Sequence, residues 1–260
     1  MDLREFYGDT ARSLAFLSRL PVPGRFFTGQ TGTMTRMVQG FPLAGALILL
    51  PVAVVLAIML SLGATPLMAT VAALSVQTLL TGALHEDGLG DTADGLGGGR
   101  DKDHALIIMK DSRVGSYGVV ALILGFALRI AAIAALAQHL PPLAAAACLP
   151  AIAALSRALM VWHWASLPPA RADGVASSLG SPQKSALHVA LISAAVIAAI
   201  TIIPAASVFA LLITLAASAG AAVAFLGFVR RRIGGHTGDT IGACQQICEA
   251  VGLTALAMAA

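Results

Sequence analysis

The segment FPLAGALILLPVAVVLAIMLS, residues 41–61, decides the fold because it contains no charged side chain from end to end. A helix of roughly 20 mostly apolar residues is enough to cross a bilayer core about 30 Å thick. Six more segments of this kind occupy residues 66–84, 117–137, 143–164, 185–203, 206–228 and 240–259. Barrel strands would be shorter and would alternate between apolar and polar residues. We therefore predict an all-α, polytopic membrane protein with about seven transmembrane helices.

The composition agrees with this prediction. Of the 260 residues, 58% are hydrophobic and 11% are charged, whereas a soluble domain carries roughly 25% charged residues. The net charge of +3 is a mild excess, which does not indicate a nucleic-acid partner. Three cysteines, Cys148, Cys244 and Cys248, indicate neither a disulfide framework nor a thiolate metal site. We expect a single integral membrane domain over residues 1–260.

The N-terminal segment, residues 1–36, has a different character. Charged residues interrupt its start, so it lacks the apolar stretch of a signal peptide. Apolar residues recur at helical spacing up to Leu20, and Pro21 and Pro23 follow. This pattern predicts an amphipathic helix on the membrane surface.

The distribution of basic residues predicts the orientation. The connections near 62–65, 138–142 and 203–205 contain no Lys or Arg. Fourteen of the 16 basic residues lie on the opposite side, which the positive-inside rule assigns to the cytoplasm. We therefore expect a bacterial inner-membrane protein with a cytoplasmic N-terminus and an external C-terminus. The segments expected in the cytoplasm are 85–116, 165–184 and 229–239.

The other two basic residues, Arg129 and Arg157, lie within predicted spans, as does Glu249. A charge inside the membrane is costly unless it is paired or functional. We predict that Glu249 faces the bundle interior and pairs with Arg129 or, failing that, with Arg157.

Residues 85–118 read HEDGLGDTADGLGGGRDKDHALIIMKDSRVGSYG and hold seven of the 13 acidic residues. Asp87, Asp91 and Asp94 are spaced i, i+4 and i+7, so a helical continuation of the second span would place them on one face. Their carboxylates suit a hard cation such as Mg²⁺. Glu86 lies about 100° away around such a helix and is a weaker ligand candidate. The alternative interpretation is a solvated acidic turn at a helix end.

Glycines are abundant in the same segment: Gly88, Gly90, Gly95, Gly97, Gly98 and Gly99. Since each glycine weakens a helix by up to about 1 kcal/mol relative to Ala, we expect an irregular loop here. A loop of this kind either lets the backbone approach a phosphate closely or serves as a plain flexible turn.

Several stretches resemble the adenosylcobinamide-GDP ribazoletransferase family, the membrane-bound cobalamin synthases. They are FLSRLPVP (16–23), FPLAGA (41–46), LLTGALHEDGLGDTADGLGGG (79–99), IMKDSRVGSYG (108–118) and GGHTGDTIGA (234–243). The pattern D-G-L-x-D-x-x-D-G is its most specific part. Glu86 departs from the family pattern, in which an apolar residue is frequent there, and Gly90 stands in place of Ala.

The resemblance implies a Mg²⁺-dependent transferase. A hydroxyl of α-ribazole, or of its 5′-phosphate, attacks the pyrophosphate of adenosylcobinamide-GDP and releases GMP. The metal is expected on Asp87, Asp91 and Asp94, with Glu86 as a further candidate. The basic residues expected at the substrate are Arg19, Arg100, Lys110, Arg113, Arg157 and Arg171. Membrane lipid is an expected partner, and a homo-oligomer is compatible with the sequence.

Two residues near the last span complete the predicted site. His236 is a candidate general base, because an ordinary histidine titrates near neutral pH; the alternative is an interfacial side chain without chemistry. Asp239 is expected either to complete the site beside the metal and substrate or to cap the last helix. The run Arg230 to Arg232 is expected to anchor the chain at the membrane.

The alternative functions are those of a CDP-alcohol phosphotransferase and of a membrane transporter. CDP-alcohol phosphotransferases share the pattern of Asp91, Asp94 and Gly95, but their two later aspartates are missing, since His104 and Ile108 stand at those positions. Transporters place their sites near the bilayer midplane, whereas these acidic residues lie at the end of a span.

Overall fold

The computed structural model describes residues 3–28, 33–171 and 178–260. Apart from one isolated β-bridge, the regular structure of these residues is helical. The long helices are α3 (Phe41–Ser61), α4 (Pro66–Thr81), α5 (Leu84–Gly98), α7 (Ser116–His139), α8 (Pro142–Ser166), α10 (Lys184–Ala205), α11 (Val208–Ile233) and α12 (Gly238–Ala259). The other helices are α1 (Leu3–Leu17), α2 (Met34–Met37) and α6 (Lys102–Ile108), with 3₁₀ turns at Gly24–Phe26 and Val38–Gly40.

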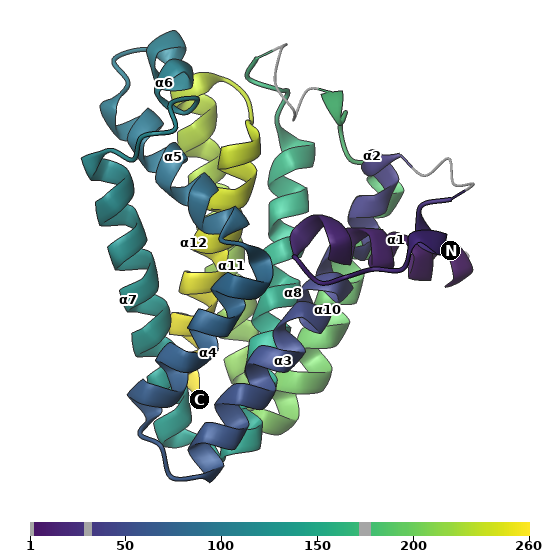
Figure 1. Ribbon diagram of the computed structural model, residues 1–260, viewed down its shortest axis with the longest axis vertical. Helices are drawn as coiled ribbons and strands as arrows, with labels where there is room; N and C mark the ends of the chain where they lie inside the picture. The colour runs from purple at the N-terminus through teal and green to yellow at the C-terminus, as the bar shows by residue number, and fades with distance from the viewer. Residues whose placement is uncertain (1–2, 29–32, 172–177) are drawn as a thin grey trace.

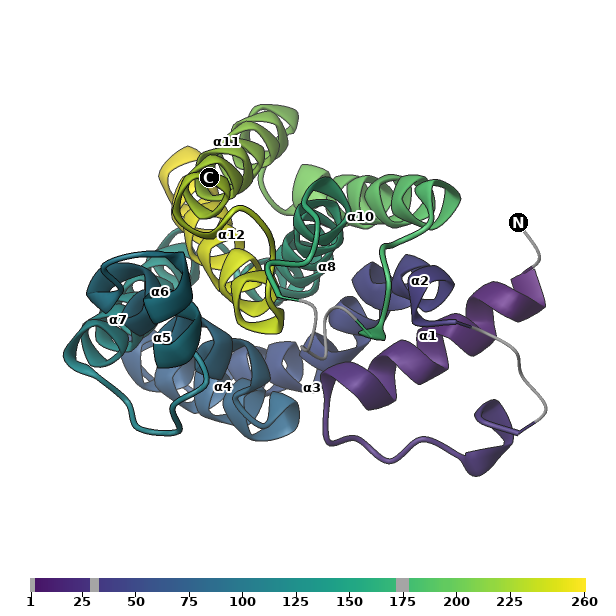
Figure 2. The same cartoon turned by 90° about the horizontal axis from the view of Figure 1, so that it is seen from above.

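Six helices of the described chain are long and apolar enough to cross a membrane, and there are seven spans if the bent pair of α4 and α5 is counted as one. The prediction of a polytopic helical membrane protein is therefore confirmed. Helix α8 lies at the centre of the bundle and packs against α3, α10 and α12 (Figures 1 and 2). Of its most apolar 18-residue stretch, 89% is buried. Large apolar side chains such as Val54, Ile123 and Ile200 cover the outside of the surrounding helices.

The sequence predicts a helical continuation of the second span into the acidic segment. The structure differs, because the chain bends between the two. The helix axis turns by 88° between α4 and α5. Gly82 and Ala83 cause this bend, because both adopt left-handed backbone angles, with φ of 65° and 58°. Glycine tolerates such angles, whereas alanine does so at a cost.

The expectation of an irregular glycine-rich loop is wrong, since residues 84–98 form helix α5. The glycines allow close packing of helices instead. A Cβ at Gly88 would crowd the backbone of α12, and one at Gly95 would overlap Met109 beyond α6. Tertiary packing therefore compensates for their weak helix propensity.

Helix α1 is present, and it lies across the side of the bundle against α3 (Figure 2). Its outer surface carries apolar side chains, among them Leu3 and Tyr7. Its inner surface is polar, because the buried Asp9 accepts hydrogen bonds from Arg12 and Gln39. The apolar exposed side fits the predicted position at a membrane surface.

Candidate active site

The site lies where α5 meets the start of α12. Gly88 and Gly242 face each other at this crossing, and a Cβ on Gly88 would lie 2.8 Å from the carbonyl oxygen of Asp239. This close approach brings the neighbouring Asp87 and the Asp239 side chain to the walls of one cavity. Helices α5 and α6 lie at one end of the bundle, and the C-terminus lies at the other (Figure 1).

Four carboxylates share this region: Asp91 lies in the electrostatic field of Asp87, Asp94 and Asp239. Asp87 is exposed, and Asp91 and Asp239 are partly exposed. Helical spacing therefore gathers the three predicted aspartates, and Asp239 joins them from α12. In the described part of the chain, no three His, Cys, Asp or Glu side chains converge closely enough to surround a metal ion.

Asp94 differs from the other three because backbone groups occupy both of its oxygens. The amides of Gly115 and Gly118 donate to them at 2.7 and 2.8 Å. Gly115 is the N-cap residue of α7 and Gly118 lies in its first turn, where backbone N–H groups lack partners within the helix. Asp94 therefore caps α7, and a Cβ on either glycine would overlap its carboxylate.

The cavity has a volume of about 300 Å³. Its wall is largely apolar, and Asp87, Asp239 and His85 form its polar part. A second cavity shares Phe16, Leu84 and Asp87 with the first and adds Arg19 to the lining. Arg19, one of the predicted basic residues, thus borders a cavity beside the acidic cluster.

A short backbone bridge holds the α8–α10 connection against the α11–α12 connection. The amide of His236 donates to Pro168 O, and the amide of Ala170 donates to His236 O, both at 2.8 Å. This bridge brings Arg171 close enough to act electrostatically on Asp239. Arg171 thus lies near the acidic cluster, and its contact with substrate stays a prediction.

His236 does not fit the role of a base that titrates near neutral pH. Its side chain is buried, and burial lowers its pKa to about 4, because the charged imidazolium is poorly solvated there. The residue is neutral at pH 7, and its backbone supports the bridge to Ala170. We correct the prediction accordingly.

Arg100, Lys110 and Arg113 lie in the connections around α6 and border neither cavity. Arg113 forms an exposed ion pair with Asp111 at 2.6 Å. Hydrogen bonds from Arg113 lower the pKa of Asp111 to about 2. The structure thus gives Arg113 a local partner on the surface.

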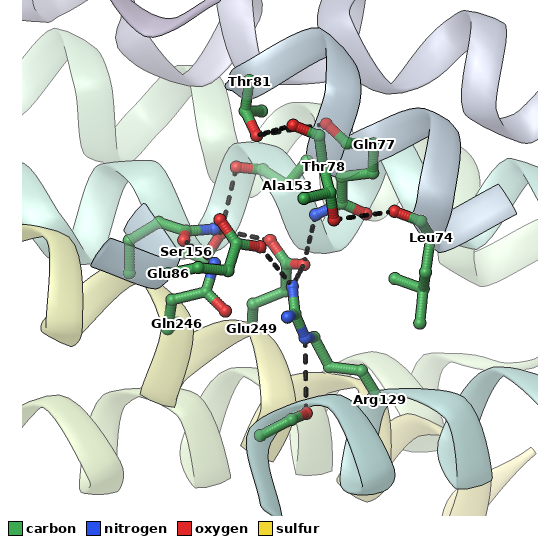
Figure 3. A network of polar contacts seen from close by, with 12 residues as sticks. Leu74, Gln77, Thr78, Thr81, Glu86, Arg129, Ala153, Ser156, Gln246 and Glu249 are labelled. Atoms are coloured by element: carbon green, nitrogen blue, oxygen red, sulfur yellow. Dashed lines mark hydrogen bonds and ion pairs between the residues drawn. The ribbon is translucent and has the colours of Figure 1, made fainter. Parts of the chain in front are cut away.

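A buried polar network lies deeper in the bundle (Figure 3). Arg129 Nη1 lies 3.1 Å from Glu86 Oε1 and 3.4 Å from Glu249 Oε1. Gln77 donates to Glu249 from α4, and Arg157 Nη1 lies 3.9 Å from the same carboxylate. The predicted pair of Glu249 and Arg129 is confirmed.

The network corrects two predicted roles. Glu86 faces the bundle interior and pairs with Arg129, so it is not placed as a metal ligand beside Asp87. The reason is its position about 100° from Asp87 around the helix. Arg157 is fully buried against Gly45 and Glu249 and borders neither cavity, so it is not placed to contact substrate.

Comparisons with known proteins identify the family of the chain. A family model described as cobalamin-5-phosphate synthase matches residues 9–257. The chain belongs to this family. It is 54% identical to the adenosylcobinamide-GDP ribazoletransferase of Rhizobium etli (strain CIAT 652) over 259 residues, which covers 100% of both chains. The corresponding enzyme of Brucella anthropi is 38% identical, again over 100% of both chains. No solved structure matches the chain.

In this member of the cobalamin-5-phosphate synthase family, the sequence did not predict three residues that cap helices at the site or line its cavity. Thr237 caps α12, so Asp239 is not needed for that role. Arg232 donates to the carbonyls of Leu96 and Gly99 at the end of α5, beyond the anchoring role expected of it. Trp164 lines the cavity. A Thr-x-x-Thr pattern at 237–240 could have indicated the cap, but the contacts of Arg232 and Trp164 depend on tertiary structure.

Proposed function

We propose that this protein joins adenosylcobinamide-GDP to α-ribazole, or to its 5′-phosphate, and releases GMP. The observation that carries the proposal is the full-length match to enzymes with this activity in their name, together with an acidic cluster at a cavity between α5 and α12. In the reaction, a ribazole hydroxyl forms a bond to the phosphorus that remains on cobinamide. The bond to GMP breaks, and the hydroxyl proton passes to a base or to solvent.

Mg²⁺ is part of this proposal. Asp87, Asp91 and Asp239 are the residues that would hold it, because they are oxygen donors with accessible carboxylates. Magnesium sites commonly use one or two carboxylates and complete the shell with water and substrate phosphates, so a ready-made cage of three side chains is not required. Bound Mg²⁺ would offset negative charge on the pyrophosphate.

The protein's own residues have separate tasks in this scheme. Arg19, at the second cavity, is suited to bind a phosphate oxygen of a phosphate-bearing substrate. Arg171 reduces the repulsion between Asp239 and the other carboxylates. Asp94 contributes by fixing α7 to α5, which holds the site in shape.

We also propose that the acidic end of the bundle faces the cytoplasm of a bacterial inner membrane. The basic residues on the connections at this end support that orientation through the positive-inside rule. Cysteine labelling at position 100 from the cytoplasmic side, and near position 140 from the outside, would agree with it. Labelling of position 100 from the outside would reverse the topology.

Purified protein in detergent with Mg²⁺, adenosylcobinamide-GDP and α-ribazole tests the activity. We expect GMP release that needs both substrates and is abolished by a chelator. CDP-diacylglycerol with an alcohol acceptor serves as the comparison reaction. Activity on that pair, without GMP release from the first, would overturn the proposal.

A further inference from the structure

The cavity beside Asp87 and Asp239 has an aromatic wall. Phe16 and Phe41 are stacked, with ring centroids 5.9 Å apart and an angle of 19° between their planes, and Trp164 also lines the cavity. Aliphatic side chains complete the apolar part of the lining: Leu17, Leu84, Met160, Leu179 and Ile241. Aromatic side chains bind flat ring systems by stacking and by edge contacts. The wall is thus suited to a planar, mostly apolar ring.

Two residues of the lining hold buried nitrogen atoms without a partner. Among the described residues, neither Trp164 Nε1 nor His85 Nε2 has a hydrogen-bond partner, and both side chains are almost entirely buried. An indole N–H can only donate, so it requires an acceptor. Buried polar groups are normally paired in proteins, and exceptions require an explanation. A ligand with one ring-nitrogen acceptor would supply a partner for the indole N–H once the Trp164 side chain turns toward the cavity.

Size and polarity discriminate between the two substrates of the proposed reaction. A volume of about 300 Å³ is at the lower end of the range for small-molecule sites. The corrinoid substrate is several times too large for it, and a guanine ring carries more polar groups than this wall can satisfy. The benzimidazole base of ribazole is planar and apolar, and it has a single free ring nitrogen.

From these observations we infer that this cavity binds the aromatic base of ribazole, with the ribose directed toward Asp87 and Asp239. The inference rests on the proposed function and identifies the subsite of one of its two substrates. It assigns Trp164 a role in base recognition, and it gives His85 a second polar contact to the nucleoside. Steady-state kinetics with each substrate varied separately provides the test.

Trp164→Phe keeps the apolar ring but removes the N–H donor, and Trp162→Phe is its matched control two residues away. We expect the first variant to raise the KM for α-ribazole about tenfold, with little change in the KM for adenosylcobinamide-GDP. Trp162→Phe should change neither value. A rise confined to the KM for adenosylcobinamide-GDP would overturn the assignment.

A steric variant keeps the test decisive if Trp164→Phe folds poorly. Leu84 is 44% exposed and borders the cavity, so Leu84→Trp should narrow it without disturbing the core. Leu124→Trp, on the outside of α7, is the control, because Leu124 is 56% exposed. We expect a tenfold or larger rise in the KM for α-ribazole from the first substitution only. Unchanged kinetics in both variants would place the cavity outside the reaction, as a site for lipid or detergent.

Direct binding separates this inference from the proposed function. In the Trp162→Phe protein, Trp164 is the only tryptophan, and α-ribazole should change its fluorescence saturably in the absence of the second substrate. Such binding without GMP release would refute the transferase but retain the subsite. GMP release without any fluorescence change at saturating α-ribazole would refute the subsite but retain the transferase.

Discussion

Asp94 and Asp87 share one helix but have different surroundings. Asp87 is exposed at the cavity, whereas Asp94 is buried and accepts two amide hydrogen bonds at the N-terminus of α7. Substitution by Asn keeps the size of each side chain and removes its charge. We therefore expect substitution of Asp87 to affect mainly metal binding and substitution of Asp94 to affect mainly stability.

We expect Asp87→Asn and Asp91→Asn to raise the Mg²⁺ concentration needed for turnover and to lower the rate roughly a thousandfold, with little effect on stability. Asp94→Asn should destabilise the protein by about 1–2 kcal/mol, because the new NH₂ group opposes one amide of α7. Magnesium titrations of activity and detergent unfolding curves measure the two effects. Equal loss of stability in all three variants would contradict this division.

His236 provides a pH prediction. Its pKa in the folded protein is about 4 and lies below the ordinary value of 6.5. Between these values the unfolded chain binds a proton that the folded chain does not, so stability should fall as the pH decreases from about 6.5 to 4 and be unaffected above 6.5. The loss attributable to this residue is on the order of 2–3 kcal/mol. Unfolding measured from pH 7.5 to 4 should show a weaker decline in His236→Asn than in the wild type.

The residue scale also shows what a sequence can predict about this site. The spacing of Asp87, Asp91 and Asp94 was sufficient to place them on one helix, because helical periodicity is local. The burial of His236 and the capping of α7 by Asp94 were not predictable, since both depend on segments far apart in the chain. Local patterns thus identified the cluster but not the different surroundings of its members.

At the scale of elements, the bend between α4 and α5 turns the acidic helix toward α12. Gly82 and Gly63 both have left-handed backbone angles, but a Cβ on Gly82 would overlap Arg19, whereas one on Gly63 would meet nothing within 4 Å. Gly82→Ala and Gly63→Ala should each cost about 1–2 kcal/mol of stability. Gly82→Ala should also displace Arg19 and raise the KM for a phosphate-bearing substrate. Identical kinetics in the two variants would argue against a role for Arg19.

The end of α5 depends on α11. Arg232 Nη2 donates to Leu96 O at 2.8 Å and to Gly99 O at 2.7 Å, which satisfies carbonyl groups that a helix end leaves unpaired. Arg232→Gln should lower stability by about 1–2 kcal/mol. The neighbouring Arg231 is exposed, so Arg231→Gln is the control and should change stability by less than about 0.5 kcal/mol. If both arginines acted only as membrane anchors, the two substitutions would have the same effect.

At the scale of the whole molecule, apolar length and the cost of intramembrane charge predicted most of the architecture. Seven apolar segments became the helices of the bundle, and Glu249 met Arg129 inside it. The entry of Glu86 into the same network could not be foreseen, because the 88° bend directs that side of α5 inward. A change of helix direction depends on packing, which a hydropathy profile does not contain.

Arg129 joins three helices of the bundle, since it lies on α7 between Glu86 of α5 and Glu249 of α12 (Figure 3). Arg129→Met retains the length of the side chain but leaves two buried carboxylates without their common cation. We expect a loss of about 3–5 kcal/mol, which is typical when one partner of a buried ion pair is removed. Detergent-induced unfolding followed by circular dichroism provides the measurement.

The same chain offers an exposed pair for comparison. Arg113 is 88% exposed and pairs with Asp111, so Arg113→Met should leave stability almost unchanged. Glu249 keeps Arg157 at 3.9 Å, so adding Glu86→Gln to Arg129→Met removes the carboxylate that has lost its ion-pair partner and should restore part of the lost stability. Such a rescue would show that uncompensated charge, rather than lost packing, destabilises the Arg129 variant. An additive double variant would instead assign the loss to the packing of Arg129 against Phe126, whose ring centroid lies 4.6 Å from the guanidinium carbon.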